Sequence, residues 1–76
     1  MTAPNQRVRV NRANRPAMLQ YIRESFDRIS ATKGGRISLI DIWDVEIKVE
    51  EVFRVSDYQS QKLTRDVIAK AKGEVA

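Results

Sequence analysis

The stretch from Ile37 to Ala71 contains no glycine, proline or asparagine, and this absence constrains the fold more than any other feature. These three residue types supply the backbone conformations of most tight turns, above all those of β-hairpins. A chain that lacks them for so long is poorly suited to a meander of short strands. No tight hairpin turn is therefore expected within it, which favours helices.

A first helix is predicted over residues 16–31. It begins at a proline, which is favoured in the first helical turn. Leu19, Ile22 and Phe26 then recur at spacings of three and four, which places them on one helical face. Gly34 and Gly35 follow, as expected where a helix has ended and the chain turns.

The middle of the chain allows two interpretations. Ser38 and Asp41 have the spacing of a capping box, and apolar residues then recur as on a helix, which predicts a helix over 39–54. Within 42–50, however, apolar and charged residues also alternate, and many are β-branched, as in a half-buried strand. We take the helix as the prediction and a strand over 42–50 as the alternative.

A third helix is predicted over residues 57–72. Ser56 is a favourable N-cap, and Gln59 stands three residues later, where a capping box needs it. Leu63 and Val67 lead its apolar stripe. The expected fold is mainly α, a compact three-helix domain resembling a helix-turn-helix over 16–76, with a flexible arginine-rich arm over 1–15. With a strand over 42–50 the fold would be a small α+β domain.

The arm carries four basic residues and no acidic one, so its charge equals the net charge of the whole chain, +4. All four are arginines, whose planar guanidinium groups form paired hydrogen bonds with phosphates and base edges. A basic block at a chain end is typical of a nucleic-acid-binding arm. Contacts to phosphates or to the minor groove are therefore predicted for Arg7, Arg9, Arg12 and Arg15.

The polar face of the third helix is the second candidate nucleic-acid contact. It comprises Gln59, Ser60, Gln61, Lys62, Thr64 and Arg65. Side chains of these types read base edges when a helix enters the major groove. The residues predicted to do so are Gln59, Gln61, Lys62 and Arg65. In a variant of this hypothesis, residues 7–11 form a strand of a dimeric β-ribbon. The leading prediction is a small double-stranded-DNA-binding protein with a regulatory or accessory role, and a homodimer is common at this size.

The alternative is a small protein-binding inhibitor or adaptor, of the kind found in phages and other mobile elements. Residues 37–54 hold five acidic residues against two basic ones, a net charge of −3, so this segment or the basic arm could dock a partner. Trp43 and Phe53 would be anchors if exposed. In so small a domain, however, the single tryptophan is expected in the core.

Enzymatic activity is not expected, because the chain has neither histidine nor cysteine. The acidic residues match no calcium-loop spacing, so no metal or cofactor is predicted. No apolar run is long enough to span a bilayer, and the polar N-terminus lacks the apolar core of a secretory signal. A cytoplasmic protein without membrane partners is the resulting expectation.

Overall fold

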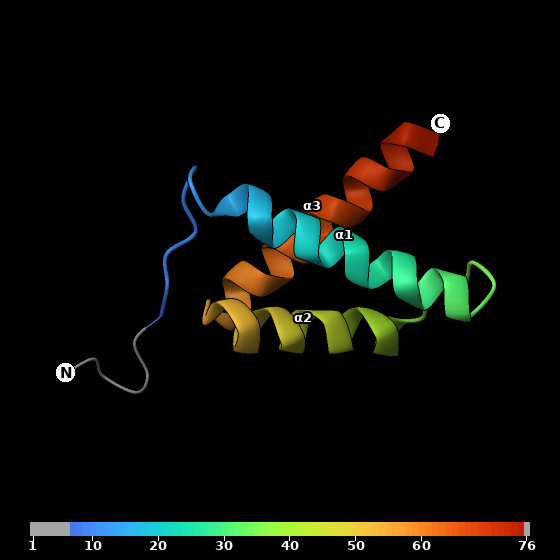
Figure 1. The fold of residues 1–76 in the computed structure, drawn as a ribbon, viewed down its shortest axis with the longest axis horizontal. Coiled ribbons are helices and arrows are strands. Elements are labelled where there is room, and N and C mark those ends of the chain that lie inside the picture. Colours follow the sequence, from blue (N-terminus) through green and yellow to red (C-terminus); the bar gives the residue numbers. More distant parts are fainter. Residues whose placement is uncertain (1–6, 76) are drawn as a thin grey trace.

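The computed structural model describes residues 7–75, with the side chains of residues 7–71 (Figure 1). It contains three helices, α1 (Arg15–Thr32), α2 (Leu39–Phe53) and α3 (Asp57–Val75). The prediction of a mainly α, three-helix domain is confirmed. The alternative strand over 42–50 is wrong, because these residues lie within α2. No strand occurs anywhere in residues 7–75, and residues 1–6 of the arm lie outside the described part. The β-ribbon variant, whose strands would pair across a dimer, stays a prediction.

Each helix contributes one face to a single core. In Figure 1, α1 and α2 run side by side in opposite directions and α3 crosses them, and all three pairs of helices are in contact. The central side chains are fully or almost fully buried. They are Met18, Ile22 and Phe26 of α1, Val45 and Val49 of α2, Val55 of the connection and Leu63 of α3.

Three small polar side chains are buried where the helices pack together: Ser25, Ser60 and Thr64. Each hydroxyl donates to a carbonyl of its own helix, so none is buried without a partner. The shortest of these bonds joins the Thr64 hydroxyl to the Ser60 carbonyl at 2.7 Å. The assignment of Ser60 and Thr64 to the polar face of α3 is therefore wrong. With its hydroxyl satisfied internally, a small residue permits close packing of helices.

The capping box predicted at the start of α2 is present. The Ser38 hydroxyl accepts a hydrogen bond from the Asp41 amide at 3.3 Å, and the Asp41 carboxylate accepts one from the Ser38 amide at 2.9 Å. The carboxylate also accepts two bonds from the Lys33 ammonium group, at 2.8 and 2.9 Å. These contacts tie the loop after α1 to the first turn of α2.

This cluster makes stability depend on pH. The Lys33 ammonium, followed by the Ser38 amide, lowers the pKa of Asp41 from 3.8 to about 2. Because the folded-state pKa is the lower one, the contribution is present above about pH 4 and is lost as the pH falls through about 2. We expect Asp41→Asn to lower the urea midpoint at pH 6 and to have a smaller effect near pH 2. Glu24→Gln is the control for loss of an exposed carboxylate, and an equal effect of Asp41→Asn at both pH values would contradict this account.

The connection between α2 and α3 is only three residues long. Arg54 adopts the left-handed conformation (φ 58°, ψ 37°), which replaces the glycine common at this position. Val55 is buried, and the Ser56 hydroxyl accepts a hydrogen bond from the Gln59 amide at 3.2 Å, as predicted for an N-cap. The connection has the length of a helix-turn-helix turn.

The strained residue in this connection gives a second prediction. A side chain in the left-handed region costs about 1 kcal/mol, and glycine removes that cost. Because the Arg54 side chain is exposed, Arg54→Gly should raise the free energy of unfolding by up to about 1 kcal/mol, measured by urea titration. Arg54→Ala retains a Cβ and should change little, and Arg54→Val should destabilise. If Arg54→Gly and Arg54→Ala changed the free energy of unfolding equally, backbone strain at this position would not explain the effect.

Candidate nucleic-acid interface

The described part of the arm lies against the α2–α3 connection and the start of α3. The Val8 amide donates to the Arg54 carbonyl at 2.8 Å, and the Arg7 guanidinium donates to the Val55 carbonyl at 3.1 Å. Val10 packs against the core. Arg7, Arg9 and Gln59, three of the predicted contact residues, line a single shallow depression with Val8, Val10 and Ser56.

A tight turn between the arm and α1 is built from two asparagines. The Asn11 carboxamide oxygen accepts from the amides of Ala13 and Asn14, both at 2.9 Å. The Asn14 side chain reciprocates by accepting from the Asn11 amide and donating to the Arg9 carbonyl. Asparagine favours such turns because its side chain mimics the backbone. The sequence interpretation overlooked this pair, although its signal, Asn-X-X-Asn before a helix start, is visible.

The four arm arginines have different surroundings. Arg15 forms an ion pair with Asp66 of α3 at 2.9 Å, and Arg7 lies 3.9 Å from Glu50 of α2. Both interactions hold the arm and the start of α1 close to the other helices. Arg9 and Arg12 are exposed, and their guanidinium groups form no hydrogen bond or ion pair with any described side chain. Within the arm, these two cations are the ones free to bind a ligand.

The exposed side of α3 begins with Tyr58 and continues with Lys62 and Arg65. These three line a second shallow depression together with Gln61 and Asp66. The Gln61 side chain donates to the Asp57 carboxylate at 3.1 Å, so its amide is partly committed within the helix. Lys62 and Arg65 are exposed, as predicted. Because Asp66 is paired with Arg15, this acidic group of α3 is already neutralised.

Acidic side chains of α2 border α3 on another side. Burial, with a contribution from Asp57, raises the pKa values of Glu46 and Glu50, while Arg65 partly offsets the shift at Glu46. Arg65 is thus close enough to Glu46 for the positive charge of Arg65 to be partly compensated. Lys62, by contrast, shares its surroundings with the Arg15–Asp66 pair. The basic groups most available to a phosphate are therefore Arg9 and Arg12 of the arm and Lys62 of α3.

Trp43 is 59% exposed, so the expectation of a core tryptophan is wrong. It belongs to an apolar row on the outer face of α2, here called the α2 stripe: Leu39, Ile40, Trp43 and Ile47. Phe53, the other proposed anchor, is half-buried and packs edge-to-face against Tyr21, with ring centroids 5.4 Å apart. A helical projection contains a signal for the stripe, because Glu46 lies between it and the buried Val45 and Val49.

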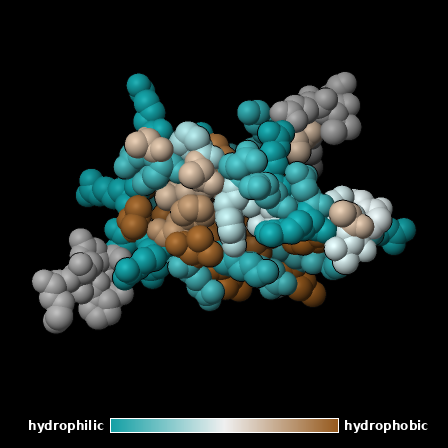
Figure 2. Space-filling model, in the orientation of Figure 1, coloured by the Kyte–Doolittle hydropathy of each residue, from teal (hydrophilic) through white to brown (hydrophobic). Residues whose placement is uncertain are grey.

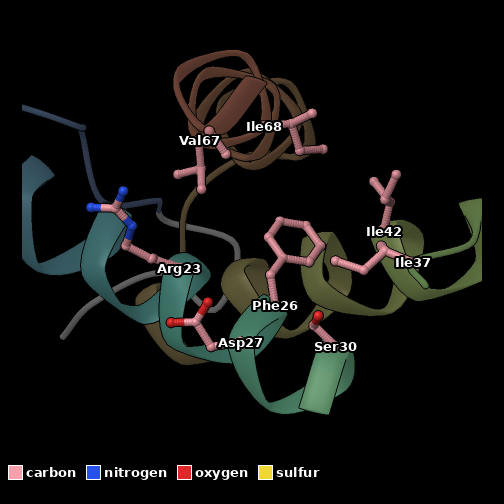
Figure 3. Close-up of a pocket in the computed structure, with 9 residues that line it drawn as sticks. Arg23, Phe26, Asp27, Ser30, Ile37, Ile42, Val67 and Ile68 are labelled. Carbon is pink, nitrogen blue, oxygen red and sulfur yellow. The ribbon is translucent and has the colours of Figure 1, made fainter. Parts of the chain in front are cut away.

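An apolar groove of about 420 Å³ lies between α1, α3 and the start of α2. In Figure 3 the Phe26 ring points into it from α1, Val67 and Ile68 face it from α3, and Ile42 lies at one end. Its rim carries Arg23 and Asp27 of α1. The groove presents no group suited to acid–base chemistry besides these rim charges.

The described side chains contain no group of three acidic residues close enough to bind a metal ion. No helix within residues 7–75 is long and apolar enough to cross a membrane. Comparison with protein families, curated proteins and solved structures finds no match to this chain.

Proposed function

We propose that this protein binds double-stranded DNA, with the arm on phosphates or the minor groove and α3 in the major groove, in a regulatory or accessory role. One observation carries the proposal: the arm packs against the α2–α3 connection, so that Arg7 and Arg9 line a depression with Gln59 of α3, and Arg15 pairs with Asp66 of the same helix. A basic arm combined with the last helix of a three-helix domain is an established way to contact both grooves.

The dimensions and chemistry of α3 are compatible with this role. The helix contains 19 residues. At the rise of an α-helix, that length corresponds to about 28 Å, enough to follow the major groove. Tyr58, Lys62 and Arg65 follow one another at spacings of four and three, so they share one face of the helix. In this proposal they face base edges and phosphates, Gln59 and Gln61 make supporting contacts, and the arm arginines hold the backbone.

The test is a salt titration with a fluorescein-labelled duplex of about 20 base pairs, followed by anisotropy. Binding that uses four phosphate contacts should weaken with a slope of about −3.6 in a plot of log affinity against log salt. Binding should be readily measured at about 50 mM salt and largely lost by about 200 mM. Absence of binding at the lower salt concentration would overturn the proposal.

A protein-binding inhibitor or adaptor role is the second candidate, and the exposed Trp43 favours it. Exposed aromatic residues within an apolar patch are typical of protein interfaces. The acidic flank of the stripe, with Asp44, Glu46 and Glu51, would select a basic partner. A nuclease-resistant complex of fixed stoichiometry that is lost in Glu46→Lys/Glu51→Lys would establish this function. A protein that binds DNA and forms no complex with another protein would exclude the inhibitor or adaptor role.

A further inference from the structure

We propose that the α2 stripe is the interface of a homodimer, in which α2 of one copy packs antiparallel to α2 of a second copy about a twofold axis at Trp43. The proposal goes beyond DNA binding and does not require it. The four stripe residues are exposed by 69% (Leu39), 66% (Ile40), 59% (Trp43) and 51% (Ile47). Figure 2 shows apolar side chains along the lower edge of the molecule, where α2 lies. Monomeric proteins rarely leave such residues grouped in water.

Three of the four stripe residues, Leu39, Trp43 and Ile47, are spaced symmetrically about Trp43, whereas Ile40 has Glu46 as its counterpart. Leu39 lies four residues before Trp43 and Ile47 four residues after it, each about one helical turn away. A twofold interface must be complementary to itself, with each contact made twice. In an antiparallel pair centred on Trp43, Leu39 of each copy meets Ile47 of the other. The tryptophans then meet at the axis, where a large aromatic side chain contributes most.

The charges beyond the two ends of the stripe are opposite in sign, with Arg36 in the loop before α2 and acidic residues near the end of α2, and this selects a second copy as the occupant. Arg36 lies seven residues before Trp43, while Glu50 lies seven residues after it and is followed by Glu51. Antiparallel packing brings Arg36 of each copy to the carboxylates of the other, whereas parallel packing would place like charges together. Antiparallel helices also align their macrodipoles favourably. The unfavourable elements are Asp44, which lies beside the axis in both copies, and Glu46, which lies opposite Ile40 of the other copy.

The size of the stripe indicates a weak dimer. Four partly exposed side chains form a patch of a few hundred Å² on each copy, below the roughly 800 Å² per partner of a standard stable interface. Ile37, 40% exposed, connects the stripe to the groove between α1 and α3 and adds to the apolar area. A dissociation constant on the order of 10 μM is expected for an interface of this size.

The experiment is sedimentation equilibrium over a range of concentrations, with Trp43 emission measured on the same samples. Trp43 is the only tryptophan, so its emission reports on the interface directly. Dilution should convert dimer to monomer and shift the emission to longer wavelength. Ile47→Lys should abolish dimerisation, with helicity measured by circular dichroism on dilute protein to show that the fold is kept. The matched control is Val52→Lys, which places the same charge at an exposed apolar residue of α2 outside the stripe.

Charge reversal tests the antiparallel register. Arg36→Glu and Glu51→Arg should each weaken the dimer roughly three- to tenfold, and the double variant should restore it. Asp44→Asn should strengthen it. A protein that stays monomeric at about 500 μM, or an Ile47→Lys variant that stays dimeric, would overturn the proposal. A double variant Arg36→Glu/Glu51→Arg that does not regain dimer affinity would also overturn it. A monomer that still binds DNA would overturn the dimer and leave the proposed function intact. A dimer that does not bind DNA would overturn the proposed function and leave the dimer intact.

Discussion

Replacement of Leu63 by alanine should destabilise this protein by about 3 kcal/mol, a large part of its total stability. Leu63 is 2% exposed and lies in α3, in the core where that helix packs against α1 and α2. Truncation loses the transfer free energy of the buried atoms and leaves a cavity that helices on all sides prevent from collapsing. In a chain of 76 residues, few other buried side chains are available to compensate.

The matched control for this prediction is the same truncation at an exposed position. Leu39 is 69% exposed. Leu39→Ala should therefore change the free energy of unfolding by less than about 0.5 kcal/mol. Urea unfolding followed by circular dichroism measures both, at a protein concentration below that of dimer formation. Comparable losses for the two variants would show that Leu39 is buried in solution and that the two faces of α2 have been assigned wrongly.

Removal of the two unpaired arginines of the arm should have the largest effect on DNA binding. The double variant Arg9→Ala/Arg12→Ala eliminates two phosphate contacts, so the salt slope should decrease by about 1.8. At about 50 mM salt the affinity should fall roughly 100-fold. Arg7 and Arg15 are less suitable for this test, because each also holds the arm or α1 against another helix.

The control for this variant removes the same charge from another part of the surface. Arg28 and Lys48 are exposed beside the depression between α1 and α2, away from the arm. Arg28→Ala/Lys48→Ala lowers the net charge equally and should leave the salt slope nearly unchanged. Equal losses in the two double variants would mean that only net charge matters, and the interface formed by the arm and α3 would be abandoned.

The helices could be predicted from the sequence because their signals are local. The capping residues Ser38 and Ser56 act on amides three positions away, and apolar residues recur over a few helical turns. The predicted ranges 16–31, 39–54 and 57–72 differ from α1, α2 and α3 by at most three residues at any end. The strand alternative for 42–50 arose because α2 has two apolar stripes. Along the sequence, residues of the two stripes take turns at every second position, so apolar and charged residues alternate as they would in a half-buried strand.

The position of the arm could not be predicted, because it depends on partners far away in the sequence. Val8 binds the carbonyl of Arg54, Arg7 that of Val55, and Arg15 pairs with Asp66. These contacts bring two of the predicted site regions together, and nothing in the local pattern of residues 7–15 encodes them. The same holds for Ser60 and Thr64, whose burial depends on where α3 meets its neighbours.

The sequence alone determined where the first and last helices begin and favoured a helix over a strand between them, since short-range hydrogen bonding and apolar recurrence act locally. Only the tertiary structure decided which side of α2 faces inward. Either stripe is apolar enough to form a core, but the compact Val45 and Val49 are the ones buried against α1 and α3. Close packing of helices favours such side chains, and the bulkier Trp43 with its stripe was left facing outward. That choice makes α2 a candidate surface for a second copy.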